Sequence, residues 1–150
     1  MNENTVEILL VEDNPNDIKL ALHAFRTHNI ANHVHVVRDG VEALEFVFCT
    51  GRYDKRNAND SPKVILLDLK LPLIDGLEVL RQIKENPLTR SIPVVIMTAS
   101  CEERDIVKGH QLGANSYIVK PVDFDQFTEA VRQLGYYWLL LNQLPATRNA

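Results

Sequence analysis

Short apolar runs alternate with longer amphipathic segments along this chain, and this alternation limits the possible folds more than any other feature. Short apolar runs between polar residues are typical of buried strands, whereas apolar residues spaced by three and four indicate helices. Strict alternation of the two predicts a parallel sheet, because each crossover must be right-handed and pack back on the sheet. We therefore expect a doubly wound α/β fold with helices on both faces. The predicted strands are 7–11, 33–37, 63–67, 93–97 and 116–119.

Helical patterns fill the intervals between these strands. The first helix has a clear start, since Asn14 can cap it, Pro15 suits the first helical position and Asp17 suits the positive end of the dipole. The polar stretch 50–62 is expected to be a long loop. The predicted helices are 15–28, 40–49, 75–85, 102–112 and 123–141.

Composition limits the compartment and the partners. The 150 residues are expected to form a single domain, with a core at about 6–134 and a C-terminal helical extension at 135–150. A net charge of −4 argues against direct nucleic-acid binding. The chain shows no signal peptide and no apolar run long enough to span a membrane, so no membrane association is expected. Its two cysteines form no C-x-x-C motif, which suits a reducing, cytoplasmic location.

Polar residues stand where the predicted strands end, which is where open parallel sheets bind their ligands. Glu12 and Asp13 follow the first strand, Asp68 the third, Thr98 the fourth and Lys120 the fifth. Each alone has a more ordinary interpretation, as a helix cap or an exposed loop residue. Their joint placement favours a shared site.

Carboxylates gathered at one edge repel one another unless a cation lies among them. Mg²⁺ is the natural cation, because it prefers oxygen ligands and uses only one or two carboxylates plus a phosphate. A remaining carboxylate can attack phosphorus and form an aspartyl phosphate. Phosphoryl transfer needs little beyond positioning and charge stabilisation, which Mg²⁺, Lys120 and the Thr98 hydroxyl would supply. We predict Asp68 as the phosphoryl acceptor.

Four motifs in order, ILLVEDN, ILLDLKLPLIDG, VVIMTAS and YIVKPVD, resemble those of CheY-like response-regulator receiver domains. The resemblance implies a flavodoxin-like (βα)5 fold with strand order 2-1-3-4-5. It also implies a two-component phosphorelay switch that accepts a phosphoryl group from a histidine kinase onto Asp68. The implied Mg²⁺ ligands are Asp13, Asp68 and the backbone carbonyl of Lys70, with Glu12 acting through a water.

The same resemblance gives roles to residues of the last two strands. Thr98 and Lys120 match the switch hydroxyl and the phosphate-binding lysine, and the Lys120-Pro121 bond is expected to be cis. Tyr117 matches the aromatic switch residue, whose ring would rotate when Thr98 moves toward the phosphate. Lys70 either alters the phosphate lifetime at the lip of the site or is an ordinary exposed lysine.

The segment GYYWLLLNQL carries apolar residues around the whole predicted helix, more than one sheet can cover. Such a surface usually marks an interface, so we expect a C2 homodimer; the alternative is a tail that folds back on its own chain. The predicted interface residues are Tyr136, Tyr137, Trp138, Leu140 and Leu141. With the long loop, this extension resembles the stand-alone receivers of cyanobacterial phytochromes, which implies a phytochrome as the kinase.

Two other functions stay open. An aspartyl-phosphate phosphohydrolase would carry D-x-D at the end of the nucleophile strand, but the second position is Lys70. An inactive pseudo-receiver would act only as a protein-binding module, which the intact set of polar residues argues against. Nucleotide binding is disfavoured because no Gly-rich loop follows the first strand. We expect a signalling protein, not an enzyme, whose chemistry is limited to self-catalysed phosphotransfer and autodephosphorylation.

Overall fold

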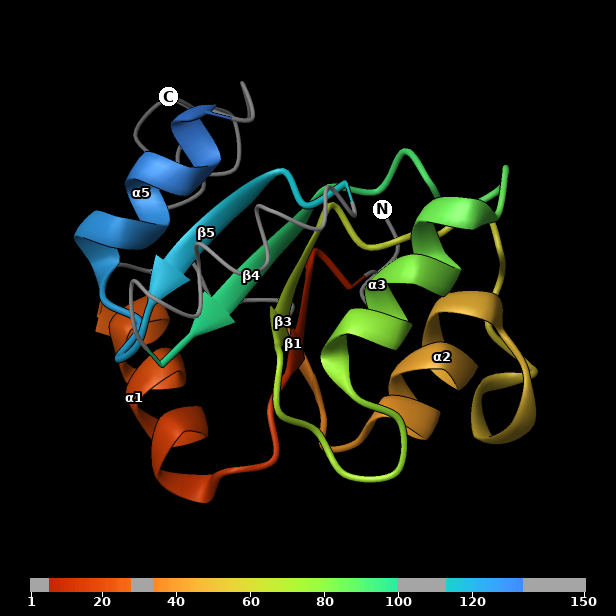
Figure 1. Cartoon of the computed structure of the whole chain (residues 1–150), viewed down its shortest axis with the longest axis horizontal. Coiled ribbons are helices and arrows are strands. Elements are labelled where there is room, and N and C mark those ends of the chain that lie inside the picture. Colours follow the sequence, from red (N-terminus) through yellow and green to blue (C-terminus); the bar gives the residue numbers. More distant parts are fainter. Residues whose placement is uncertain (1–5, 28–33, 100–112, 134–150) are drawn as a thin grey trace, which may run out of the picture.

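A computed structural model of the chain describes residues 6–27, 34–99 and 113–133. Five parallel strands form one sheet in the order β2-β1-β3-β4-β5, as expected (Figure 1). The strands are β1 (Ile8–Val11), β2 (Val34–Val37), β3 (Val64–Asp68), β4 (Val94–Thr98) and β5 (Ser116–Val119). The α-helices in the described ranges are α1 (Pro15–Thr27), α2 (Gly40–Phe48), α3 (Gly76–Glu85) and α5 (Phe124–Gln133). The predicted helix 102–112 lies outside the described residues, as does the end of the predicted last helix.

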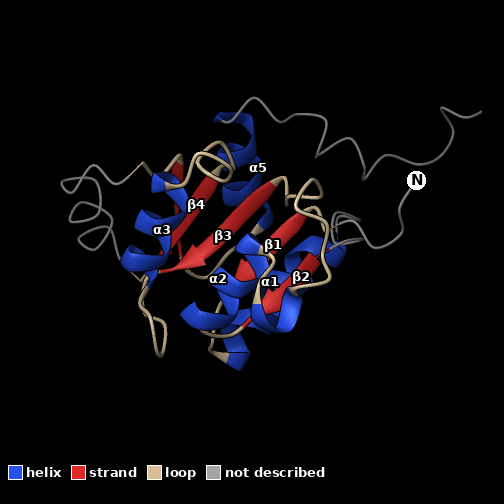
Figure 2. Ribbon diagram, turned by 90° about the vertical axis from the view of Figure 1, so that its right-hand side faces the viewer, coloured by secondary structure: helices blue, strands red, loops and turns tan. Residues whose placement is uncertain are grey.

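Helices cover both faces of the sheet, because its central strands are apolar on both faces up to the polar residues that end β3 and β4. Side chains alternate between the two faces along each strand. Leu9 belongs to the apolar cluster beneath α2 and α3, and Ile8 to the cluster beneath α1 and α5. In the second cluster the rings of Phe25 and Phe127 pack edge to face, with their centroids 4.8 Å apart. Figure 2 shows the sheet between its two layers of helices. None of the described helices is both long enough and apolar enough to cross a membrane.

Helix α1 begins at Pro15, as predicted. Asn14 caps it, because Asn14 Oδ1 accepts hydrogen bonds from the backbone N–H groups of Asn16 at 2.8 Å and Asp17 at 3.1 Å. The cap holds the first turn of α1 at the carboxyl end of β1, which is the sheet edge where the site was predicted.

The turn from β3 into α3 depends on a close approach of two backbones. Gly76, the first residue of α3, donates its N–H to the Leu69 carbonyl at 2.8 Å. A Cβ atom on Gly76 would lie 2.2 Å from the carbonyl oxygen of Asp68, so only glycine fits without a shift of the backbone. Helix α3 starts one residue later than predicted because Asp75 is its cap, accepting the N–H of Glu78 at 2.9 Å.

The segment 50–62 is a loop, as predicted, but it contains a short 3-10 helix, η2 (Gly51–Tyr53). The Arg56 guanidinium stacks over the Phe46 ring at 3.9 Å and donates a hydrogen bond to the Asp60 carbonyl at 2.7 Å. The contact with Phe46 ties the loop to α2, whereas the hydrogen bond to Asp60 lies within the loop. Sequence periodicity reveals neither contact, since both depend on the path of one long side chain.

Candidate phosphoryl-acceptor site

Carboxylates from two neighbouring strands meet beyond the ends of β1 and β3. Glu12, Asp13 and Asp68 each offer a carboxylate oxygen, and these oxygens lie within 4.8 Å of one another. The strands pair in parallel with Val11 opposite Leu67, so the residues that follow each of these two lie side by side. The structure thus brings together the three acidic residues that the sequence placed at this edge.

The three carboxylates differ in their exposure. Glu12 is 1% exposed and Asp68 is 4% exposed, whereas Asp13 faces solvent. The predicted strand 63–67 is displaced by one position, so Asp68 is the last residue of β3 and not the first residue of the loop. Its place in the strand explains its burial. Asp13 therefore marks the open side of the site, from which an ion or a phosphoryl donor would enter.

Lys120 lies among these carboxylates. Its Nζ atom is 2.9 Å from Glu12 Oε1, 3.1 Å from Asp68 Oδ1 and 3.2 Å from Asp17 Oδ2. The lysine follows β5, which is separated from β3 by β4, so its long side chain spans that gap. The Lys120-Pro121 peptide bond is cis, as the resemblance implied. An ammonium group has three N–H donors, and here each has a carboxylate within reach.

Burial and charge act against each other in this cluster. Burial raises the pKa of Glu12 to about 7, although the hydrogen bond from Lys120 lowers it. Burial also disfavours the charged form of Lys120, but the contacts with Glu12 and Asp68 outweigh burial and raise the pKa of the lysine. Three carboxylates, those of Glu12, Asp13 and Asp68, meet here against the single ammonium of Lys120, so the cluster is short of positive charge. A divalent cation would correct this shortage, and a donor set made only of oxygens suits a hard ion such as Mg²⁺ or Mn²⁺.

Thr98 offers a hydroxyl at the same edge. It is the last residue of β4, one position later than the predicted strand end, and it is fully buried. Within the described ranges, its Oγ1 atom has no hydrogen-bond partner. Buried hydroxyls are nearly always paired. Because Met97 lies opposite Asp68 in the β3–β4 register, this hydroxyl stands just beyond the acidic residue.

Of the remaining predicted residues, Lys70 and Tyr117 belong to the described part of the chain, and the interface residues do not. Lys70 is exposed on the loop after β3. Tyr117 lies half-buried in β5 opposite Ile96, and burial raises its pKa. The proposed interface residues lie outside the described residues; these are Tyr136, Tyr137, Trp138, Leu140 and Leu141.

Asp17 contacts Lys120, a contact that was not predicted from the sequence. From the sequence, Asp17 was expected only at the positive end of a helix, and it does lie in the first turn of α1. A signal was present, because the first turn of a helix that follows β1 directly must lie at the carboxyl edge of the sheet.

The chain matches the family model of the response regulator receiver domain over residues 8–132. It therefore belongs to the response regulator receiver family, as its motifs indicated. Members of this family are signalling proteins of two-component phosphorelays, and the parallel sheet and acidic edge described above agree with that class.

The chain is similar to several response regulators, some of which are named as response regulators of phytochromes. The solved structure of the bacteriophytochrome response regulator AtBRR is 51% identical, with a TM-score of 0.83, covering 87% of this chain and 93% of that one. The phosphorylated cyanobacterial phytochrome response regulator RcpA is 39% identical, with a TM-score of 0.70 and coverages of 88% and 92%. Response regulator Rcp1 of Synechocystis sp. is 37% identical over 139 residues, which are 93% of this chain and 92% of Rcp1. A solved structure of Rcp1 is its Mn²⁺-bound form, with a TM-score of 0.69.

Proposed function

We propose that this response regulator accepts a phosphoryl group on Asp68 from the phosphohistidine of a phytochrome-type kinase, with Mg²⁺ at the acidic cluster. The observation that carries the proposal is the Lys120 ammonium held between Glu12 and Asp68, 2.9 and 3.1 Å from their oxygens. An incoming phosphoryl group brings negative charge to the acceptor carboxylate. An ammonium beside that carboxylate is well placed to stabilise this charge.

The reaction uses the carboxylate of Asp68 as nucleophile. A carboxylate oxygen bonds to phosphorus, the P–N bond to the kinase histidine breaks, and the imidazole leaves with the bond's electron pair. Lys120 and the Thr98 hydroxyl donate hydrogen bonds to the phosphoryl oxygens. Asp13, Asp68 and the Lys70 carbonyl would hold Mg²⁺, with Glu12 acting through a water, and the ion would supply charge that neutralises part of the phosphoryl group. Water later attacks the acyl phosphate, which releases inorganic phosphate and restores the carboxylate.

The signal would leave the site through Thr98. Its hydroxyl has no partner among the described residues, so a phosphoryl oxygen would give it one. The resulting movement would alter the packing of Tyr117, which contacts the cluster beneath α2 and α3. We propose this pair as the switch, in which a local charge event biases a packed aromatic side chain.

Intact mass after treatment with acetyl phosphate or phosphoramidate and Mg²⁺ tests the proposal. The wild-type chain is expected to gain the mass of one phosphoryl group, and Asp68→Asn is expected to gain none. Asp125→Asn, an exposed first-turn acid of α5, is the matched control and should be phosphorylated normally. A wild-type chain that gains no mass would instead be a pseudo-receiver. Continuous release of phosphate from small phosphate monoesters would favour the phosphohydrolase.

The kinase and the oligomeric state need separate tests. A phosphorylated bacteriophytochrome kinase is expected to transfer its label to this chain faster than a histidine kinase of another sensory class; equal rates would remove the phytochrome assignment. Sedimentation at micromolar concentration tests the homodimer that we propose from the C-terminal segment. A strict monomer would contradict that dimer.

A further inference from the structure

Asp17 is the third carboxylate on Lys120, and it differs from the other two in origin and exposure. Its Oδ2 atom lies 3.2 Å from Lys120 Nζ, a contact between residues 103 positions apart in the chain. The Asp17 side chain is 30% exposed, whereas those of Glu12 and Asp68 are almost fully buried. Asp17 therefore contacts the lysine from the solvent side of the cluster.

Hydrogen bonds that start inside the site hold Asp17 in this position. Glu12 Oε2 accepts the backbone N–H of Asn14 at 3.1 Å, and Asn14 Oδ1 accepts the backbone N–H of Asp17 at 3.1 Å. The same glutamate contacts Lys120 through its other oxygen. Glu12 thus binds the lysine directly and also orders the turn that presents Asp17 to it.

In this arrangement Lys120 is already paired with three carboxylates. The ammonium has three N–H groups, and three carboxylates lie within 3.2 Å of it. A phosphoryl oxygen that arrives at Asp68 must compete with these carboxylates for the ammonium. The negative charge of Asp17 also repels the incoming anion, and at such short range in a partly buried site this repulsion is only partly screened.

We propose that Asp17 is a positioning residue that competes with the phosphoryl group for Lys120 and so lowers the affinity of the site for that group. The inference rests on the proposed function, since it concerns the same lysine and the same acceptor. It assigns Asp17 a restraining role, not a catalytic one.

Binding of beryllofluoride, measured by ¹⁹F NMR at saturating Mg²⁺, tests the proposal. Asp17→Asn and Asp17→Ala are expected to lower the half-saturating beryllofluoride concentration by about three- to ten-fold. Asp125→Asn removes an equivalent first-turn charge from α5 and should bind as the wild type does. A distorted α1 would weaken binding, so the direction of the change separates competition for Lys120 from simple structural damage.

Tighter binding in either Asp17 variant supports the proposal. Unchanged or weaker binding in both variants overturns it, provided that the wild type binds beryllofluoride. If the wild type neither binds beryllofluoride nor gains a phosphoryl group, the proposed function itself fails, and the two failures are therefore distinguishable.

Discussion

Two basic side chains in this protein, Lys120 and Arg81, each contact several carboxylates, but they differ in burial and in where their partners lie along the chain. The Lys120 side chain is 18% exposed, and its partners come from the ends of β1 and β3 and from the start of α1. The Arg81 side chain is 44% exposed, and its partners Glu78 and Glu85 lie on the same helix, α3. The first cluster requires the folded chain, whereas the second requires only a helix.

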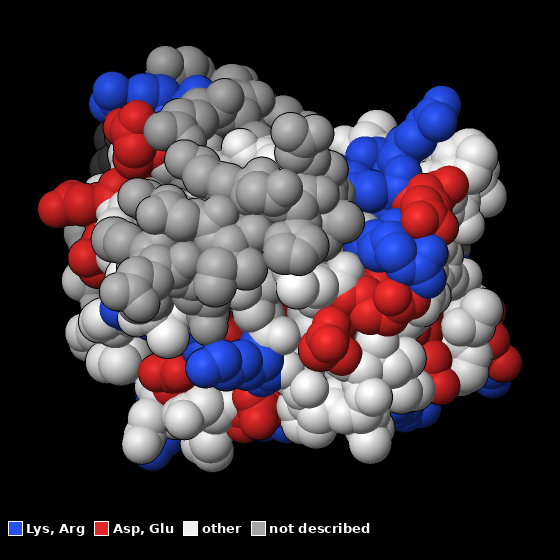
Figure 3. All heavy atoms as spheres, in the orientation of Figure 1, with Lys and Arg blue, Asp and Glu red and all other residues white. Residues whose placement is uncertain are grey.

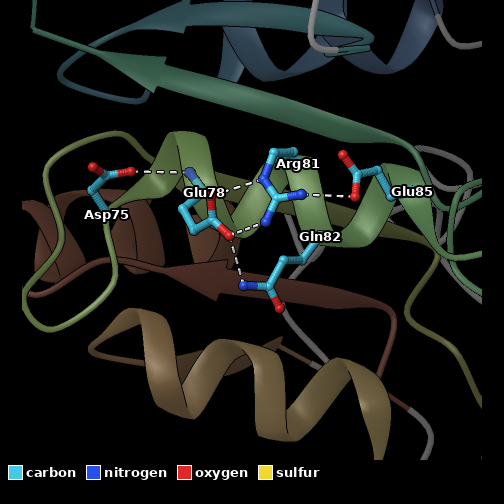
Figure 4. A network of polar contacts seen from close by, with 5 residues as sticks. All are labelled: Asp75, Glu78, Arg81, Gln82 and Glu85. Atoms are coloured by element: carbon cyan, nitrogen blue, oxygen red, sulfur yellow. Dashed lines mark hydrogen bonds and ion pairs between the residues drawn. The ribbon is translucent and has the colours of Figure 1, made fainter.

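The α3 network is a surface feature. In Figure 3, basic and acidic atoms lie side by side on the surface over α3. Figure 4 shows Arg81 between Glu78 and Glu85, with Arg81 Nη1 2.7 Å from Glu85 Oε1. Hydrogen bonds from Arg81 and Gln82 lower the pKa of Glu78 to about 2. Exposed pairs of this kind are screened by water and salt and add little to stability. Burial and origin in distant segments, more than the number of ion pairs, distinguish the Lys120 cluster as the candidate functional site.

Removal of Lys120 should have the largest effect. Lys120→Met keeps most of the side-chain volume but leaves Glu12 and Asp68 without their ammonium. Because an uncompensated buried charge is costly, we expect the free energy of unfolding to fall by about 3 kcal/mol. Mg²⁺ should restore part of this loss by supplying positive charge. Urea unfolding with and without Mg²⁺ measures both effects. If Lys120→Met without Mg²⁺ were as stable as the wild type, the proposed difference between Lys120 and Arg81 would be contradicted.

A half-buried network should give an intermediate effect that depends on pH. The Tyr53 hydroxyl donates to Glu42 Oε2 at 2.6 Å and lies 3.0 Å from His35 Nε2. Burial lowers the pKa of His35 below its ordinary value of 6.5, although the charge of Glu42 opposes this shift. The unfolded chain therefore binds a proton at His35 more readily than the folded chain does. Stability should decrease as the pH falls below 6.5.

Substitution of this histidine isolates its contribution. His35→Gln should flatten the dependence of unfolding free energy on pH between 6.5 and the lower pKa of the folded state. His23→Gln, on the exposed surface of α1, is the matched control and should keep the wild-type slope. An unchanged slope in His35→Gln would show that the half-buried network does not respond to protons.

Removal of Arg81 should have the smallest effect. Arg81→Ala breaks the network on α3, but its members are exposed and return to water. The midpoint of thermal unfolding is expected to stay within experimental error of the wild type, and acetyl phosphate should modify Asp68 as before. Large destabilisation that high salt abolishes would show that surface charges matter more here than their exposure suggests.

The sheet and most of the site could be predicted because both follow from chain topology. Parallel strands end at one edge, so the positions of Glu12 and Asp68 after two apolar runs were sufficient to place them together. The strand end at Asp68 was displaced by one residue, since hydrogen bonding continues beyond the apolar run. The place of Asp17 at this edge could be inferred from the helix that follows β1 directly, but its contact with Lys120 could not. That contact depends on how α1 leaves β1 and on the path of a long side chain, which periodicity does not specify.

The close approach at Gly76 constrains mutation in a way that a list of polar residues does not reveal. A Cβ atom on Gly76 would lie 2.2 Å from the backbone oxygen of Asp68, so even a methyl group would force the backbone beside the proposed acceptor to shift. A gene could therefore preserve every acid, the threonine and the lysine, and still encode an inactive switch after one glycine codon changed. The signalling competence of a homologue should thus be judged by the residue at the position of Gly76 as well as by its reactive side chains.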